Sequence, residues 1–151
     1  MAARDNVRLS LRLLSTSRLI EREVDALMRA RFNSTIARFD FLSALDRHGA
    51  LTLGEVSEYL LVSNGNITQL NARLKADRLI ESEQDANDRR VHRVRLTTRG
   101  ATVFKLMAKA HATLIDRLLG DLTQADRHAL MRLADGAKAS IRRTLTKGAA
   151  P

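Results

Sequence analysis

The sequence predicts a mainly α-helical fold with one small β-hairpin, in the order of a winged helix-turn-helix embedded in a helical dimerisation frame. Three observations predict it. The only proline among the 151 residues is Pro151, so no pyrrolidine ring interrupts a helix in the body of the chain. Apolar residues recur with helical spacing over most of the sequence. One stretch around Val94 alternates instead with the period of a strand.

The first predicted helix runs from Val7 to Met28 and is apolar on two sides. A helix of this kind is covered by two neighbours, one of which can be another subunit. The first strip consists of Leu9, Leu13, Ile20, Val24 and Leu27, and the nearly opposite strip of Val7, Leu11 and Leu14.

Three short helices are predicted next, each with its own end signal. The first ends at Arg47-His48-Gly49, a cation and glycine ending that is typical of helices. Thr52 and Glu55 have the spacing of a capping box that begins the second helix, and Ser63 is placed to cap the third. The apolar face of the first of these helices carries Ile36, Phe39, Leu42 and Leu45. The apolar face of the third carries Ile67, Leu70 and Leu74.

A hairpin with a long, charged tip follows these helices. Its predicted strands are Leu79 to Glu83 and Val91 to Leu96, because the polar run from Gln84 to Arg90 between them has turn chemistry.

Two amphipathic helices complete the chain. Thr97 or Thr98 caps the first, and Thr123 with Asp126 starts the second. The apolar face of the first carries Phe104, Met107, His111, Leu114 and Leu118. The apolar face of the second carries Leu130, Leu133, Ala137, Ile141 and Leu145.

The composition limits the classes of function. A formal net charge of +9 indicates an anionic partner: nucleic acid, an anionic membrane or an acidic ligand. The absence of cysteine excludes disulfides, thiolate metal sites and thiol redox chemistry. We expect a cytoplasmic protein without a membrane partner, because no apolar run reaches the roughly 18 residues of a membrane span and no signal-peptide pattern is present.

An enzyme is not expected. The four histidines fall on separate predicted elements, and the sequence has no HExxH motif, glycine-rich phosphate loop or Gly-x-Ser-x-Gly turn. We therefore predict no catalytic residue, no cofactor and no metal site, since the spacing of histidines and carboxylates does not support one.

The polar side of the helix after Ser63 suits a DNA groove. Small residues at Gly65, Ala72 and Ala76 permit close approach, while asparagine, glutamine, arginine and threonine can each contact base edges. A solvated polar helix face is the alternative interpretation. The candidate DNA-binding residues here are Ser63, Asn64, Asn66, Thr68, Gln69 and Arg73.

The hairpin tip places Arg89 and Arg90 beside Asp88. An arginine at a loop tip can enter a narrow minor groove, and a neighbouring aspartate can fix its guanidinium group. A surface ion-pair turn of little energetic value is the alternative. All three residues are candidate DNA-binding residues.

Four segments resemble the MarR family of bacterial transcriptional regulators: Phe41 to Gly49, Leu51 to Leu60, Ser63 to Leu74 and Asp88 to Gly100. The most specific part is the wing, with Asp-x-Arg followed by a strand and Leu-Thr-x-x-Gly. In element order the resemblance spans nearly the whole chain.

The resemblance implies a homodimer whose interface is made by the first, fifth and sixth helices. It also implies that the fourth helix lies in the major groove and that Asp88 orients Arg90 in the adjacent minor groove. Two-fold symmetry then requires a pseudo-palindromic operator in double-stranded DNA, with half-sites about one helical turn apart.

Two residues depart from the family pattern. Gln69 stands where many members have arginine, so its base preference cannot be transferred. Arg78 stands where glycine is usual, so either the turn avoids a positive φ or Arg78 bears a modest strain.

Family members commonly respond to small aromatic or phenolic anions. A hypothesis for this chain is an effector pocket lined by Ser15, Arg18, Phe39 and His111. The alternatives are an interface salt bridge or a snorkelling side chain for Arg18, and a satisfied core histidine for His111.

The sequence thus predicts a sequence-specific DNA-binding transcriptional regulator, a repressor released by a small anionic effector such as an aromatic or phenolic acid or its CoA thioester. The alternative is a non-specific architectural DNA-binding protein. Within one compact domain per subunit, the expected parts are an N-terminal dimerisation helix (1–34), the winged helix-turn-helix (35–99) and C-terminal dimerisation helices (100–151).

Overall fold

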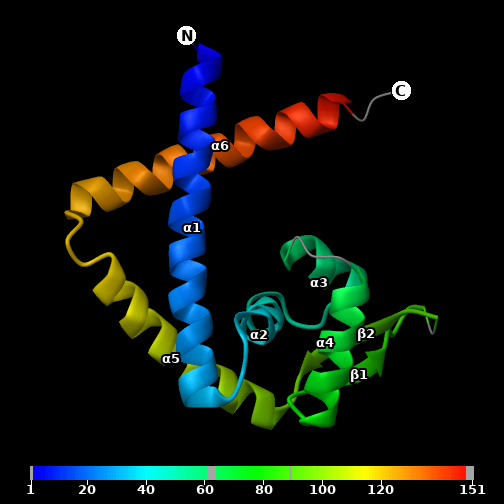
Figure 1. Ribbon diagram of the computed structural model, residues 1–151. Helices are drawn as coiled ribbons and strands as arrows, with labels where there is room; N and C mark the ends of the chain where they lie inside the picture. Colours follow the sequence, from blue (N-terminus) through cyan, green and yellow to red (C-terminus); the bar gives the residue numbers. More distant parts are fainter. Residues whose placement is uncertain (1, 61–63, 89, 149–151) are drawn as a thin grey trace. The chain divides into compact units, whose positions relative to one another are not determined.

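The structure is a computed structural model that describes residues 2–60, 64–88 and 90–148. Within these residues the elements follow in the predicted order, and the mainly α fold with one hairpin is confirmed (Figure 1). They are α1 (Ala2–Phe32), α2 (Ile36–His48), α3 (Leu53–Leu60), α4 (Asn64–Ala76), β1 (Ile80–Gln84), β2 (His92–Leu96), α5 (Thr98–Leu118) and α6 (Gln124–Gly148).

The chain divides into two compact units, Met1–Leu114 and Ile115–Pro151. The first unit contains α1 to β2 and most of α5, so the first predicted dimerisation helix and the winged helix-turn-helix share one unit. The functional division at residues 34 and 99 stays a prediction.

The core of the first unit is built from α1, α2, α3, α4 and α5, together with Ile80 of β1 and Val94 of β2. Only the C-terminal half of α1 takes part, with Val24 and Met28 buried, whereas the side chains from Val7 to Leu19 are exposed. The most deeply buried side chains are Phe41, Met28, Leu42, Ile67, Leu74, Met107 and Val56.

The predicted helix caps are present where the structure describes them. The Thr52 N–H donates to Glu55 Oε2 (2.7 Å), and the Glu55 N–H donates to Thr52 Oγ1 (3.2 Å), which is the reciprocal pattern of a capping box. Thr97, rather than Thr98, caps α5, because its Oγ1 accepts the Gly100 N–H at 2.9 Å. Ser63, the predicted cap of α4, lies outside the described residues.

The hairpin is antiparallel, with Ile80 opposite Leu96 and Gln84 opposite His92. A third segment joins it, because Leu51 exchanges backbone hydrogen bonds with Val94 at 3.0 and 2.7 Å. The hairpin is therefore attached to the segment between α2 and α3 as well as to α4.

The turn after α4 has a positive φ at Arg78, +57°. The Arg78 N–H donates to the Lys75 carbonyl, and the Leu79 N–H donates to the Leu74 carbonyl. This is the hydrogen-bond pattern of an α-helix that ends with one residue in the left-handed conformation. Of the two alternatives for this turn, the structure thus has the strained residue.

Candidate nucleic-acid interface

The fourth helix places its polar residues on its exposed side. Ile67 and Leu74 are buried as predicted, while Asn66, Thr68, Gln69 and Arg73 are exposed. Asn64 is the first residue of α4, but its side chain, like Ser63, lies outside the described part of the chain. The exposed polar side is consistent with both a base-reading face and a solvated face.

A groove of about 370 Å³ runs beside this face of α4. Its α4 wall consists of Asn66, Gln69, Leu70 and Arg73, and its opposite wall of Asp25, Arg29, Thr35, Ile36 and Ala37 from the end of α1 and the start of α2. The structure thus brings three of the candidate residues to one side of the helix.

Asp25 joins α1 to the start of α2 at the edge of this groove. Its Oδ1 accepts the Ile36 N–H at 2.9 Å, and its Oδ2 accepts from Arg29 Nε at 2.5 Å. These bonds to Ile36 and then Arg29 hold the pKa of the Asp25 carboxyl below its usual range. The charged carboxylate satisfies a free N–H of the α2 N-terminus from eleven residues away.

The wing tip is folded around Asp85. Its Oδ1 accepts the N–H groups of Asn87 (2.9 Å) and Asp88 (3.3 Å), and its own N–H donates to the Val91 carbonyl at 2.9 Å. An aspartate that binds the backbone two and three residues ahead is a common turn former. In Figure 1 this tip extends beyond α4.

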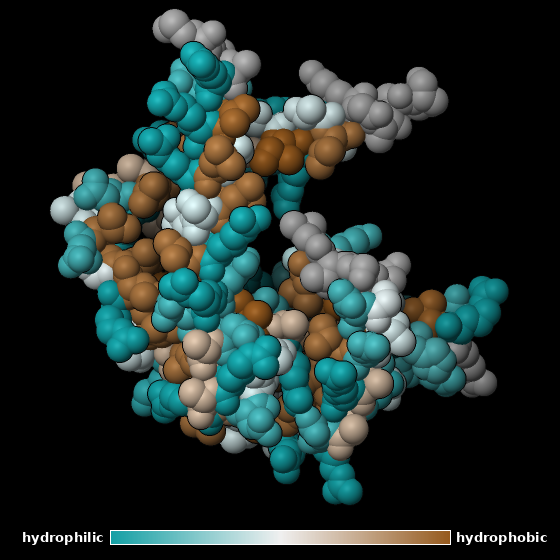
Figure 2. All heavy atoms as spheres, viewed as in Figure 1, coloured by the Kyte–Doolittle hydropathy of each residue, from teal (hydrophilic) through white to brown (hydrophobic). Residues whose placement is uncertain are grey.

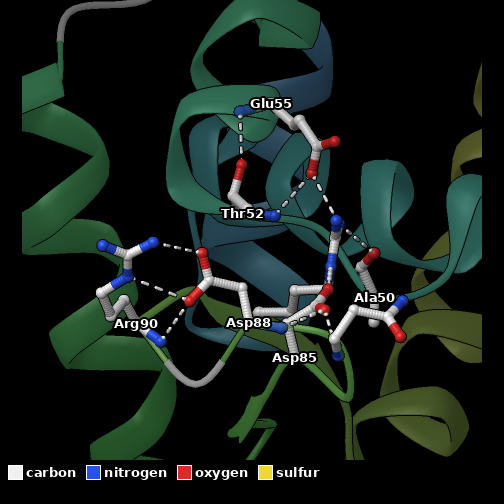
Figure 3. Close-up of polar contacts among 8 residues, drawn as sticks. Ala50, Thr52, Glu55, Asp85, Asp88 and Arg90 are labelled. Atoms are coloured by element: carbon white, nitrogen blue, oxygen red, sulfur yellow. Dashed lines mark hydrogen bonds and ion pairs between the residues drawn. The ribbon is translucent and has the colours of Figure 1, made fainter.

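Asp88 holds the side chain of Arg90 (Figure 3). Its Oδ1 accepts from the Arg90 N–H (3.0 Å) and from Nε (3.2 Å), and its Oδ2 accepts from Nη2 (3.3 Å). The Arg90 side chain nevertheless remains 90% exposed. The bonds from the Arg90 side chain lower the pKa of Asp88, with a smaller contribution from the Arg90 backbone. The predicted pairing of the two residues is present, while Arg89 lies outside the described residues.

Arg93 has a role that the sequence did not predict. Its Nε donates to Asp85 Oδ2 (2.7 Å), and its Nη1 donates to Glu55 Oε2 (3.0 Å) and to the Ala50 carbonyl (3.5 Å). Figure 3 shows these partners converging from the wing and from the start of α3. Arg93 belongs to the alternating strand, but the pattern alone does not reveal that its partners lie in two other segments.

The ion pair of Arg38 with Asp77, which joins α2 to the turn after α4, was likewise not predicted from the sequence. The Arg38 side chain is only 19% exposed. No spacing in the sequence connects two residues 39 positions apart.

Two of the four candidate effector-binding residues are in contact. The ring centroids of Phe39 and His111 lie 4.9 Å apart. Burial lowers the pKa of His111, which favours the neutral imidazole. Ser15 and Arg18 are exposed on α1, and the Ser15 hydroxyl donates to the Arg12 carbonyl. The described contacts therefore do not join these two residues to the Phe39 and His111 pair.

The described residues include neither a candidate membrane-spanning helix nor a candidate metal cluster. No helix among them combines the length and apolarity needed to cross a membrane. Nor does any group of three or more histidine, aspartate or glutamate side chains in that part of the chain lie close enough to hold a metal ion.

The chain is similar to known transcriptional regulators. The MarR family model matches residues 33–91. The HTH-type transcriptional repressor MdtR of Bacillus subtilis (strain 168) is 27% identical over 118 residues, which cover 76% of each chain.

Solved structures show the same fold. A mutant of MarR from E. coli complexed with operator DNA has a TM-score of 0.78 at 22% identity, covering 88% of this chain and 95% of that one. BpsR of Bordetella bronchiseptica, whose DNA binding is regulated by 6-hydroxynicotinic acid, has a TM-score of 0.70 at 25% identity. The match covers 84% of this chain and 98% of that one. The winged helix-turn-helix and these matches together make the chain similar to the MarR family of transcriptional regulators.

Proposed function

We propose that the chain is a sequence-specific DNA-binding repressor that acts as a homodimer and is released from its operator by a small anionic effector. The observation that carries the proposal is the pairing of Asp88 with Arg90. It presents a highly exposed guanidinium group in a defined orientation at the tip of the wing. Two of the three bonds to Asp88 come from the guanidinium group itself, and the third comes from the Arg90 backbone N–H.

In this proposal α4 lies in the major groove and the wing tip in the adjacent minor groove. Asn66 and Gln69 are amides suited to adenine edges, and Arg73 is suited to guanine or to a phosphate. The negative potential of a narrow minor groove attracts Arg90. Ser63, Asn64, Thr68 and Arg89 complete the proposed DNA-binding residues.

Exposed apolar side chains support the homodimer. Figure 2 shows them along the upper part of α1 and along α6. On α1 they are Val7, Leu9, Leu11, Leu13, Leu14 and Leu19, and on α6 Leu130, Met131, Leu133, Ile141 and Leu145. Apolar surface of this extent is usually covered by a partner, and a two-fold interface would also match two operator half-sites.

The proposed effector is an aromatic or phenolic acid or its CoA thioester. The regulation of BpsR by 6-hydroxynicotinic acid supports an aromatic acid in this family. In this chain the rings of Phe39 and His111, tilted by 35° with their centroids 4.9 Å apart, would supply the aromatic contact. Ser15 and Arg18, from either subunit of the dimer, would supply the hydroxyl and the positive charge.

Selection of bound fragments from random double-stranded DNA tests the DNA-binding part of the proposal. The expected result is enrichment of an inverted repeat with half-sites about ten base pairs apart. Recovery of fragments without a common sequence would contradict it and favour the architectural alternative. Release of the selected operator by aromatic acids, compared between the wild type and Arg18→Ala, then tests the effector part.

A further inference from the structure

Arg93 bridges two carboxylates that belong to different parts of the fold. Asp85 lies at the wing tip and Glu55 in the first turn of α3, and the guanidinium group of Arg93 binds both, at 2.7 and 3.0 Å. The Arg93 side chain is 31% exposed, and that of Asp85 is 18% exposed. The wing tip is thus fixed to α3 by one partly buried cation.

Both carboxylates also accept hydrogen bonds from backbone N–H groups of their own segments. Asp85 forms the tip turn through the N–H groups of Asn87 and Asp88, and Glu55 caps α3 through Thr52. Hydrogen bonds to Arg93 and to the tip backbone lower the pKa of Asp85, and the bond from the Thr52 backbone is the main cause of the lowered pKa of Glu55. Both groups therefore remain charged at neutral pH.

Removal of Arg93 would leave Asp85 and Glu55 facing each other without a cation. Like charges repel, so the tip turn would move away from α3. Asp88 is bound to Asp85 through its N–H, and Asp88 in turn holds Arg90. A displacement of Asp85 is thereby passed on to the exposed guanidinium group of Arg90.

Arg95 provides a natural contrast two residues along the same strand. It pairs with Glu81 (2.8 Å) and Glu83 (3.0 Å), both on β1. Its ion pairs lie within the hairpin and connect neither the wing tip nor α3. Arg95 therefore carries the same charge in the same strand without the bridging contact.

We propose that Arg93 is a positioning residue that fixes the wing tip to α3, so that Arg90 meets the minor groove at a set distance from the bases read by α4. The inference rests on the proposed function. It adds a residue that acts on DNA only through Arg90, because its donors are directed to Asp85, Glu55 and Ala50.

The test compares Arg93→Gln with Arg95→Gln on the operator obtained by the selection. We expect Arg93→Gln to weaken operator binding about tenfold and Arg95→Gln less than about threefold. In the Arg90→Ala background, Arg93→Gln should cause no further loss, because the side chain through which it acts is absent. Equal losses for the two glutamine variants, or an undiminished loss in the Arg90→Ala background, would overturn the proposal.

Base substitution under the wing gives a readout that a general loss of structure would not change. A G·C pair adds the guanine 2-amino group to the minor groove, whereas an inosine·cytosine pair lacks that group. The wild type should discriminate between these two replacements of an A·T pair, and Arg93→Gln should lose most of this discrimination. Unchanged discrimination in Arg93→Gln would contradict the proposal.

The Arg93→Lys variant and thermal unfolding of each variant distinguish loss of the bridge from loss of the folded structure. Lysine retains the charge but lacks the planar fork that reaches two carboxylates, so we expect a folded protein with affinity between those of the wild type and Arg93→Gln. Full wild-type affinity of Arg93→Lys would contradict the bridging role. If the wild type itself selects no common sequence, the proposed function fails; if only the contrast between Arg93 and Arg95 is missing, this inference fails.

Discussion

Gly100 lies directly against the backbone of Leu79. A Cβ atom on residue 100 would stand 1.8 Å from the Leu79 carbonyl oxygen and 2.8 Å from its carbonyl carbon. Thr97 binds the same turn, since its N–H donates to the Leu79 carbonyl (3.1 Å) and its Oγ1 donates to the Arg78 carbonyl (2.8 Å). The Leu-Thr-x-x-Gly segment therefore holds the start of α5 on the turn between α4 and β1.

We predict that Gly100→Ala destabilises the protein by about 3 kcal/mol or more, because backbone rather than a flexible side chain must move. Urea unfolding measures this change. Gly136→Ala is the control, since no atom lies within 4 Å of its added Cβ; in the interior of α6 it should stabilise by about 0.5–1 kcal/mol. Equal stability of the Gly100→Ala variant and the wild type would show that the described contact is wrong.

Arg78→Gly should stabilise the protein. The left-handed conformation at φ +57° costs a residue with a Cβ about 1–2 kcal/mol, and the greater freedom of glycine in the unfolded chain offsets part of this gain. We expect a net increase of about 0.5–1 kcal/mol in the free energy of unfolding. Arg78→Ala removes the same charge but keeps the Cβ, so it should give no such gain; an equal gain would assign the effect to charge.

Asp40→Asn should stabilise the protein at neutral pH but not in acid. Burial raises the pKa of Asp40, and Glu21 adds a smaller effect of the same sign. A raised carboxyl pKa means that the folded state binds the proton more readily than the unfolded state. The cost of the charge is therefore fully present above the folded pKa and disappears as pH falls to the ordinary aspartate range.

Denaturant unfolding at several pH values checks this prediction. We expect a gain of about 0.5–1 kcal/mol at pH 7 that vanishes near the ordinary aspartate pKa. Asp46→Asn, which removes an exposed carboxylate from the same helix, should change stability little. A gain that is independent of pH would contradict burial of the charge as its cause.

Features encoded by neighbouring residues were predictable. The caps at Thr52 and Thr97 depend on side chains three residues from the N–H that they bind, so a short stretch of sequence contains both partners. The pairing of Asp88 with Arg90 is local in the same sense.

Features that join distant segments were not predictable. The bonds of Asp25 with Ile36 and of Arg93 with Glu55 depend on how helices and strands pack, and nothing in the spacing of these residues identifies the partner. For Arg78 the sequence left two alternatives, because the chain can leave a helix through a turn with or without a positive φ.

The most direct test of the proposed DNA-binding mode is the salt dependence of operator binding by Arg90→Ala. Arg22→Ala, which removes another exposed arginine, here from α1, serves as the control. We predict that Arg90→Ala weakens operator binding by about tenfold or more and lowers the salt slope by about one unit, while Arg22→Ala stays close to the wild type. Operator affinity and a salt slope for Arg90→Ala equal to those of Arg22→Ala would contradict the placement of Arg90 in the minor groove.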